Sequence, residues 1–461
     1  MKNPLLLKLL SLAGVGIALA AFLSMIQGII AERQSYRQEA ISSVSDSVAG
    51  AQTLLGPVLH MSCTESWAQR GEDRKITQEK REFVASSTPQ TLNVQTQVTV
   101  EHRTRSIYSA QVLNTKAALK ATFVPSDLQQ PKNTVAGSRM QCDAPILTLA
   151  LDDPRGIRHA SIKFNGQDIK LKAGSAHPTY KRGMHAQLID LPTAALIAKG
   201  EALSAELQVE FVGTQQLGIV PLGETTTITM SSNWPHPSFI GRFAPSERKI
   251  SPGQGFTAEW RLNAIATNAG EQVSRGMPLC DRQADAGKEC AEIVQVAFVE
   301  PVNAYSLSDR ASKYGLLFIV LTFVAVGLFE VMKKLRVHPV QYLLAGSAIC
   351  SFFLLLVSLS EHIGFARAYA AGASATVLLL TFYASHMLGG KWRGLPFGAG
   401  MAALYALLYA LLQLEQTALV MGSVVLFIVL AIVMILTRRI NWYEQFSSHS
   451  KSASQPPSPM V

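Results

Sequence analysis

The sequence predicts an α-helical membrane protein with six transmembrane helices and a large inserted β-rich domain, an antiparallel sandwich or curled sheet. Three observations support this fold class. Apolar runs long enough to cross a hydrocarbon core of ~30 Å occur once near the N-terminus and five times after residue 312. Residues 31–312 contain no run of that length and are rich in short β-type segments. The mean hydropathy of +0.20, with only 16% charged residues, is typical of a protein with both soluble and membrane parts.

The chain divides into four predicted segments. Residues 1–30 form an N-terminal transmembrane signal-anchor, 31–312 the β-rich domain, 313–443 a five-helix transmembrane bundle and 444–461 a disordered tail rich in Ser and Pro. Ala18-Leu19-Ala20 has the form of a signal-peptidase site, so a cleaved signal is the alternative for the first segment. The apolar run from Leu9 to Ile30 is long enough to span a membrane, which favours the uncleaved anchor.

The five later spans are predicted at Tyr314–Met332, Val340–Leu359, Ala366–Leu388, Leu395–Leu412 and Ala418–Leu436. Their loops alternate in charge. The loops expected on the same side as Lys2 and Lys8 carry Lys333, Lys334, Arg336, Lys391, Arg393, Arg438 and Arg439, whereas the opposite loops carry only Glu361, His362, Arg367 and Glu415. The positive-inside rule therefore places both termini in the cytoplasm and residues 31–312 outside it.

The net charge of +9 does not indicate nucleic-acid binding. Residues 31–312 hold 29 basic and 28 acidic residues, so the basic excess lies beside the apolar segments, where membrane topology accounts for it.

Within the exported region, residues 32–51 predict a helix that continues from the first span and stops at Gly56-Pro57. Most of the remaining signal is β. Strands are predicted at Leu92–Val100, Ile146–Leu151, Ile157–Phe164, Leu203–Val212, Thr225–Met230 and Glu292–Val299. Asn165-Gly166 is a strong hairpin signal.

Four of the five cysteines lie in the exported region: Cys63, Cys142, Cys280 and Cys290. An even number of cysteines in an oxidising compartment predicts two disulfides. Cys280 and Cys290 close a short loop and are the natural pair, which leaves Cys63 with Cys142, although four cysteines allow three pairings. A metal site is disfavoured because no C-x-x-C is present.

The sequence predicts no catalytic, cofactor or metal site, since it contains no H-E-x-x-H, G-x-S-x-G or complete Walker A motif. The central turns of the spans hold no ionisable residue, which disfavours a charge-coupled transporter. A passage for lipid or a neutral solute stays open. Glu330 is expected to pair locally with Lys333 or Lys334, and Gly394-x-x-x-Gly398 allows close helix packing.

Two clusters are candidate interaction sites. The first cluster lies at the outer ends of two spans and consists of Arg310, Lys313, Glu361 and His362. It forms either a polar contact between domain and bundle or an interfacial pairing of Glu361 with Arg310, Lys313 or Arg367. The second cluster lies in the segment Trp234 to Trp260, whose prolines, glycines and aromatic residues predict an irregular ordered loop followed by a strand. Its candidate residues are Trp234, His236, Phe239, Arg242, Phe243, Arg248, Phe256 and Trp260, which form either a binding surface or aromatic packing beneath the loop.

Six segments of the chain carry a resemblance to a known family: Trp234–Trp260, Pro301–Tyr305, Asp309–Gly315, His338–Tyr342, Leu359–Phe365 and Thr437–Tyr443. Together they resemble the CreD family of inner-membrane, cell-envelope integrity proteins. The departures are small: Ala244, Asn303 and Asn441 stand where the family usually has Leu, Asp and Asp. Residues 70–230 match least.

The resemblance implies a Gram-negative inner-membrane protein whose β-rich domain faces the periplasm. It also implies a link to a two-component system of envelope and carbon-source response and to tolerance of β-lactams and colicins. No enzymatic activity is established for the family. The leading hypothesis is therefore a non-enzymatic envelope-maintenance protein whose partners are the lipid bilayer and envelope proteins or envelope components. A carrier of lipid or a neutral solute is the alternative, followed by an enzyme acting on envelope components. The sequence does not predict the oligomeric state.

Overall fold

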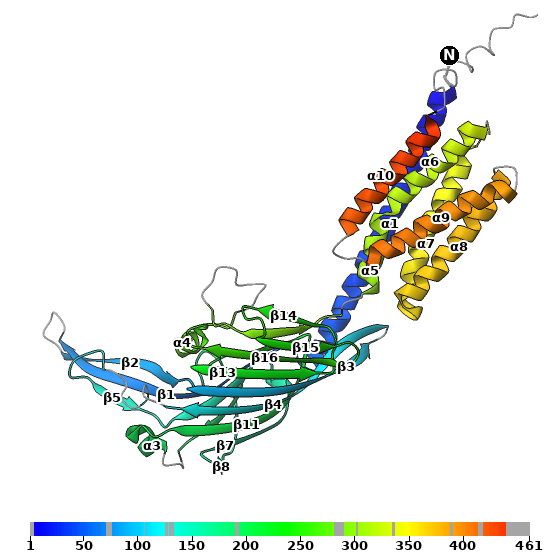
Figure 1. Cartoon of the computed structure of the whole chain (residues 1–461). Helices are drawn as coiled ribbons and strands as arrows, with labels where there is room; N and C mark the ends of the chain where they lie inside the picture. Colours follow the sequence, from blue (N-terminus) through cyan, green and yellow to red (C-terminus); the bar gives the residue numbers. More distant parts are fainter. Residues whose placement is uncertain are drawn as a thin grey trace, which may run out of the picture. The chain divides into compact units, whose positions relative to one another are not determined.

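The structure of the chain is a computed structural model, drawn in Figure 1. It describes residues 4–70, 76–105, 107–124, 128, 133–189, 193–280, 290–300, 303–333, 337–387, 391–413 and 418–438. The chain forms two units: a helical unit, made of Met1–Tyr36 and Val302–Val461, and a β unit, Arg37–Pro301. The predicted disordered tail 444–461 lies outside the described residues, as do the charged loop residues Lys2, Lys334, Arg336, Glu415 and Arg439.

The β unit contains two sheets. Sheet A has nine described strands in the order β14-β17-β12-β1-β6-β10-β9, with β2 and β5 also paired to β1. Sheet B has eight, in the order β15-β16-β13-β3-β4-β11-β7-β8. The strands of sheet A are β1 (Gln52–Arg70), β2 (Ile76–Ser87), β5 (Arg139–Cys142), β6 (Ile146–Leu151), β9 (Lys172–Ala173), β10 (Gly183–Gln187), β12 (Gln216–Ile219), β14 (Pro237–Gly241) and β17 (Val294–Phe298). Those of sheet B are β3 (Thr91–Arg105), β4 (Tyr108–Phe123), β7 (Ile157–Phe164), β8 (Gln167–Asp168), β11 (Leu203–Thr214), β13 (Thr225–Ser232), β15 (Glu247–Ser251) and β16 (Gly255–Asn263).

Both sheets contribute to one hydrophobic core, which makes the β unit a sandwich. Leu59 and Leu147 of sheet A belong to the same buried cluster as Val94, Leu119 and Leu207 of sheet B. Short helical pieces lie between the strands: η1 (Pro154–Gly156), α3 (Thr193–Lys199) and α4 (Ala269–Ser274).

All six predicted strands are confirmed, as β3, β6, β7, β11, β13 and β17. The physical reason is visible in β3, whose residues alternate between buried and exposed over the segment that the sequence pattern identifies. The predicted antiparallel arrangement is wrong at two places. β1 pairs with β12, and β3 with β13, in parallel register, because these partners come from distant parts of the chain and no tight hairpin fixes their direction.

The hairpin predicted at Asn165-Gly166 is confirmed. Phe164 of β7 pairs with Gln167 of β8, and the two residues between them have φ values of 48° and 78°. Positive φ at both central positions is the requirement of a type I′ turn, which Asn and Gly meet at low cost.

The predicted helix stop at Gly56-Pro57 is wrong. The first helix, α1 (Pro4–Ser47), ends nine residues earlier, and Gly56 and Pro57 lie inside β1. They form an irregularity where the register of β1 against β6 shifts between Leu55 and Val58. Glycine is required there, since Gly56 has a φ of +129° and a Cβ would lie 2.8 Å from the Thr148 carbonyl oxygen.

Besides α1, the helical unit contains α5 (Ala304–Lys313), α6 (Gly315–Lys333), α7 (Pro339–Ile363), α8 (Phe365–Met387), α9 (Lys391–Gln413) and α10 (Ala418–Thr437). The described residues of the six predicted spans lie in helices, except Tyr314, which precedes α6. Four described helices are long and apolar enough to cross a membrane, in the segments Leu10–Ser47, Pro339–Ile363, Phe365–Met387 and Gly394–Gln413. A fifth span results if α5 and α6, which meet at a bend of 41°, count as one, and the apolar part of α10, Gly422–Ile435, is shorter.

The two compact units do not coincide with the predicted segments, which divide at 30/31 and 312/313. The helical unit extends to Tyr36 and begins again at Val302, so α5 belongs to it. Leu307 and Ala311 of α5 are buried in the core of the helical unit, and this packing outweighs the polar composition that made residues 302–312 resemble an exported segment.

Glycines on neighbouring helices let the helices of this unit pack closely. On α1, the buried residues Leu19, Leu23, Ile26 and Ile30 recur at helical spacing and form the face that packs in the core. A Cβ on Gly346 of α7 would lie 2.1 Å from Leu19 Cδ1. Likewise, Cβ atoms on Gly394 and Gly398 of α9 would meet the hydroxyls of Ser385 and Thr381 at 2.2 and 2.1 Å, so this G-x-x-x-G pair does bring α8 and α9 into close contact.

Candidate functional site

The segment from Trp234 to Trp260 is more regular than predicted. It contains β14 and β15 as well as the expected strand, β16, so the predicted irregular loop is wrong. Its glycines and prolines lie at strand ends: Pro237 and Gly241 bound β14, and Gly255 begins β16.

Two of the predicted interaction residues in this segment, Phe256 and Trp260, are core aromatics, and partly buried Phe239 packs against them. Trp260 is fully buried and donates its Nε1–H to the Phe243 carbonyl oxygen at 3.1 Å. The Phe239 ring lies edge-on to the rings of Phe256 and Trp260, both at 5.8 Å between centroids. For these residues the aromatic-packing alternative describes the structure.

Trp234 lies at the edge of the same segment and is half-buried. Its Nε1–H is shared between the carbonyl oxygens of His236 and Val299, at 3.2 and 3.1 Å. Its ring lies 5.7 Å from that of His102 on β3. His236, Arg242 and Arg248 are exposed, so they are the part of the predicted interaction surface that solvent reaches.

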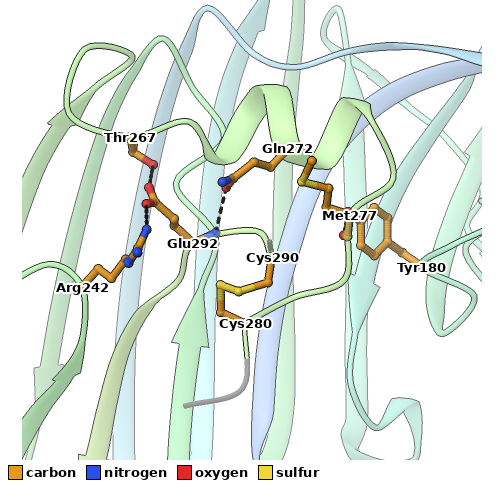
Figure 2. Close-up of a disulfide and its surroundings, with 8 residues drawn as sticks. All are labelled: Tyr180, Arg242, Thr267, Gln272, Met277, Cys280, Cys290 and Glu292. Atoms are coloured by element: carbon orange, nitrogen blue, oxygen red, sulfur yellow. Dashed lines mark hydrogen bonds and ion pairs between the residues drawn. A yellow bond between two sulfur atoms is a disulfide. The ribbon is translucent and has the colours of Figure 1, made fainter. Parts of the chain in front are cut away.

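Arg242 joins a polar network that the sequence did not predict, centred on Glu292 (Figure 2). In this Glu292 network, Arg242 Nη1 donates to Glu292 Oε1 at 2.5 Å and Thr267 Oγ1 donates to Oε2 at 2.8 Å. The Glu292 N–H donates to Gln272 Oε1 at 3.2 Å. Glu292 is 9% exposed, so its carboxylate is anchored by a charge-assisted bond largely out of water. The network ties the segment after β14 to the chain around α4 and to the start of β17.

The network lies beside a disulfide between Cys280 and Cys290, whose Cα atoms are 4.9 Å apart (Figure 2). The second disulfide joins Cys63 and Cys142, which are direct partners in the β1–β5 register, with Cα atoms 4.1 Å apart. Both disulfides match the pairing that the sequence favoured, in which Cys280 and Cys290 close a short loop and Cys63 is left with Cys142. Cys350 is a free thiol buried in α7.

A buried carboxylate lies two residues from Cys63. Glu65 accepts bonds from the N–H groups of Thr134 and Val135, at 2.7 and 3.1 Å, and from the hydroxyls of Thr134 and Ser138, at 2.5 and 2.7 Å. These donors, above all the two hydroxyls, lower the pKa of Glu65 to about 2. Glu65 therefore binds the turn at residues 133–138 to β1.

The four residues predicted to connect domain and bundle all belong to the helical unit. Glu361 accepts a hydrogen bond from the Tyr305 hydroxyl at 3.0 Å and lies 3.7 Å from Arg33 Nε; we call these three residues the Glu361 cluster. Lys313 pairs with Asp309 at 2.8 Å, and His362 is exposed. The prediction thus missed Arg33, because α1 meets α7 only through the tertiary fold.

A second carboxylate cluster lies near the other end of the same helices. Glu330 of α6 forms an ion pair with Lys8 of α1, accepts the Tyr342 hydroxyl at 3.0 Å and accepts the Val337 N–H at 3.3 Å. We call Lys8, Glu330 and Tyr342 the Glu330 cluster. The predicted local partner Lys334 and the side chain of Lys333 lie outside the described residues. In each cluster α1 supplies the cation and a tyrosine supplies a hydroxyl.

Comparison with known proteins identifies the family of this chain. A family model described as "Inner membrane protein CreD" matches residues 4–443. The curated Inner membrane protein CreD of Escherichia coli (strain K12) is 33% identical over 456 residues, which cover 99% of this chain and 97% of that protein. The chain belongs to the CreD family. It is thus an inner membrane protein with several apolar helices and a β-rich domain.

Several of the residues that carry the CreD resemblance have structural roles. His338 caps the N-terminus of α7 and forms a capping box with Gln341. Gly315 begins α6, where a Cβ would lie 2.7 Å from Leu23 of α1. In the described part of the chain, no group of three or more His, Cys, Asp or Glu residues is placed to hold a metal ion.

Sequence reasoning missed Glu292, Glu65 and Arg33. One local signal for Glu292 was available: it is a single carboxylate in the otherwise apolar run from Ala291 to Val294. A charge inside an apolar run predicts a buried partner. No comparable local signal identifies Arg33.

Proposed function

We propose that this CreD family member is a non-enzymatic protein that maintains cell-envelope integrity under stress. In this proposal six helices span the inner membrane, both termini are cytoplasmic and the β unit lies in the periplasm. The family resemblance extends the role to a two-component envelope and carbon-source response and to tolerance of β-lactams and colicins.

The observation that carries the proposal is the placement of the two carboxylate clusters in the helical unit. Lys8 and Arg33 are 25 residues apart on one continuous helix, or ~38 Å at ~1.5 Å per residue. This exceeds the ~30 Å hydrocarbon core and stays within the ~40–45 Å of the whole bilayer. The charges are therefore suited to the two interfaces, where each is paired, and they brace the helices instead of forming a relay at the membrane centre.

The cysteines support the periplasmic placement of the β unit. All four of its cysteines form disulfides, and disulfides persist in the periplasm but not in the cytoplasm. Labelling single cysteines introduced at exposed Gly364 and at Arg438 from either side of the membrane tests the topology. The proposal expects periplasmic labelling at residue 364 and cytoplasmic labelling at residue 438.

The integrity role is tested by uptake of an excluded dye in cells that lack the gene. We expect the full chain to restore exclusion and Glu361→Gln to fail at normal expression, because a neutral amide loses the pairing with Arg33. His362→Ala is the matched control, since this neighbouring side chain is exposed, and it should restore exclusion. If the deletion strain does not leak, the integrity role is wrong.

The second candidate, a carrier of lipid or a neutral solute, is favoured by one observation. The Tyr405 hydroxyl is buried in α9 and has no hydrogen-bond partner among the described residues, although the Tyr369 hydroxyl donates to the Tyr405 carbonyl oxygen at 2.6 Å. A buried hydroxyl without a partner costs ~1–3 kcal/mol, and a polar guest would recover it. A carrier predicts that Tyr405→Phe loses function while the protein stays folded. A bracing role predicts full complementation by the same variant.

A further inference from the structure

Three histidines of the β unit, His60, His177 and His185, gather on one face of sheet A; we call them the histidine cluster. His60 lies on β1, and His185 on β10 pairs directly with Thr148 of β6. Paired residues and those two positions away share a face, so His60, Thr148 and His185 lie on the opposite face from Leu59. His177 lies in the segment 175–180, here called the strap, which covers this face.

His60 is buried as a neutral ring. It is 0% exposed, and its Nε2 lies 2.9 Å from Thr148 Oγ1. The Thr148 hydroxyl donates its own hydrogen to the Ser175 carbonyl oxygen at 2.5 Å, so Nε2 of His60 must be the donor. Nδ1 is then the unprotonated nitrogen, and it has no hydrogen-bond partner among the described residues. A proton added there would place a charge in a buried site, which burial disfavours.

His177 holds the strap in shape only while it is neutral. Its Nδ1 accepts the N–H groups of Thr179 and Tyr180, at 3.2 and 3.3 Å. A protonated Nδ1 is a donor and cannot accept either bond. The ring is 6% exposed and stands edge-on to His60 at 5.1 Å between centroids, so a charge on either ring opposes a charge on the other.

The groups that face the cluster supply no described counter-charge. His185 Nδ1 lies 2.5 Å from the Gly174 carbonyl oxygen, and its register partner on β9 is Lys172, which donates to Gln187. From the strap, Tyr180 packs on His177 with ring centroids 4.9 Å apart. Protonation thus adds positive charge on the face of sheet A that also carries Lys172.

The strap also holds the chain that leads to the disulfide. The Tyr180 hydroxyl donates to the Met277 carbonyl oxygen at 2.5 Å, three residues before Cys280, and Figure 2 shows Tyr180 beside Met277. Motion of the strap therefore reaches the segment between α4 and the Cys280–Cys290 bridge.

We propose that the histidine cluster is an acid-sensitive latch, in which neutral His60 and His177 hold the strap on sheet A and their protonation releases the strap together with its bond to Met277. This adds a response to proton concentration to the integrity role. The latch is a property of the β unit and does not depend on that role.

The expected pH range follows from the direction of the shifts. Burial, followed by the repulsion of His177, lowers the pKa of His60 from its ordinary 6.5 to about 4, and burial also lowers the pKa of His177. A lowered histidine pKa means that the closed form binds protons less well than the open form. The closed form is therefore most stable above pH 6.5 and loses stability as pH falls toward 4. For His60 alone, the opening equilibrium should rise about 20-fold between pH 7 and pH 5.

Hydrogen exchange of the full chain in lipid nanodiscs tests the latch, with rates corrected for the intrinsic effect of pH. We expect opening of peptides that cover residues 172–187 and 274–280 to rise by at least about 20-fold from pH 7 to pH 5, since His177 adds to the contribution of His60, while a peptide from β3 stays protected. His60→Gln should weaken the pH dependence, and the double variant His60→Gln, His177→Gln should abolish it. Exposed His102→Gln on β3 is the matched control and should behave as the unmodified chain.

A further variant keeps the test decisive if the double variant does not fold. Tyr180→Phe retains all three histidines and loses only the bond to Met277, so it should raise opening at pH 7 and preserve the ratio of opening between pH 5 and pH 7. Equal exchange at pH 7 and pH 5 in the unmodified chain would overturn the proposal. So would an acid response of the same size in β3, which indicates general unfolding, or one that persists in a folded double variant.

Discussion

The buried polar groups of the two units differ in where their partners come from. In the β unit, Glu65 and His60 are fully buried and hydrogen-bonded to hydroxyl or backbone groups, with Arg81 Nε at 4.0 Å from Glu65, and Glu292 pairs with Arg242. In the helical unit, Glu330 and Glu361 keep side-chain exposures of 15% and 10% and are paired with cations from α1. Hydrogen bonds that favour ionised Glu65, and burial that favours neutral His60, shift the pKa values of these groups and make the stability of the β unit depend on pH. The ion pairs of the helical unit join α1 to α6 and to α7. The difference indicates a β unit that responds to its medium and a helical unit built for a fixed geometry.

The largest expected effect separates the two units. Trp260→Ala should destabilise the β unit by ~3–5 kcal/mol, because it removes a fully buried indole from the sandwich core. Thermal unfolding in detergent, followed by near-ultraviolet dichroism and by helix content, should show the β transition moving alone. A shift of both transitions together would mean that the units are not energetically separate.

Removal of one partner from the Glu330 cluster tests whether α1 is fixed by charge. Lys8→Met should destabilise the helical unit by ~2–4 kcal/mol, since Glu330 is left largely buried without its cation. The double variant Lys8→Met, Glu330→Gln should recover most of the loss. Unfolding in sodium dodecyl sulfate measures both, and additive losses would contradict a direct interaction.

The fit of α1 against α7 gives a somewhat smaller effect. Gly346→Leu should cost ~1–3 kcal/mol by overpacking against Leu19, where even a Cβ is too close. Gly400→Leu is the matched control, because a Cβ at Gly400 meets no atom within 4 Å. The same unfolding measurement should find little change in the control, and equal losses at both sites would show that leucine itself, not the contact, is responsible.

Acid should reveal the contribution of the hydrogen-bonded carboxylate Glu65 to the stability of the β unit. Its pKa, lowered to about 2, means that the folded state favours the ionised form, so its contribution is complete above the ordinary value near 4.5 and is lost as pH falls toward 2. Glu65→Gln should remove that part of the acid sensitivity. Proteolysis of the turn at residues 133–138 across pH 5 to 2.5 measures it, with exposed Glu210→Gln as the control.

The smallest effect is expected on the solvent face of sheet B. Lys116 and Glu210 form an exposed cross-strand pair at 3.1 Å. Lys116→Ala should change the unfolding free energy by less than ~1 kcal/mol, since exposed pairs are screened by water and salt. A larger loss would show that this face has a packing role.

The sequence was sufficient to predict those elements whose structure follows from a local residue pattern. The alternation in β3, the Asn165-Gly166 turn and the apolar lengths of the helices depend on neighbouring residues alone. It was insufficient where partners meet only in the folded chain. Arg33 reaches Glu361 through helix packing, and Glu292 receives Arg242 through sheet pairing. In Trp234–Trp260 the glycines and prolines indicated a loop because their usual role in turns does not distinguish a loop from the ends of short edge strands.

The parallel pairing of β1 with β12 has a consequence for how the β unit is made. Gln52 emerges directly after α1, yet its partner Leu217 follows 165 residues later. Thr91 of β3 likewise pairs with Thr225 of β13, which comes much later in the chain. Long-range pairing of this kind slows folding, since the chain loses the conformational entropy of a long loop before the paired strands make stabilising contacts. Each newly synthesised chain therefore passes through a period in which β1 lacks one of its final partners and is open to proteolysis and aggregation, so the yield of folded protein should depend on the folding rate as well as on the stability of the finished fold.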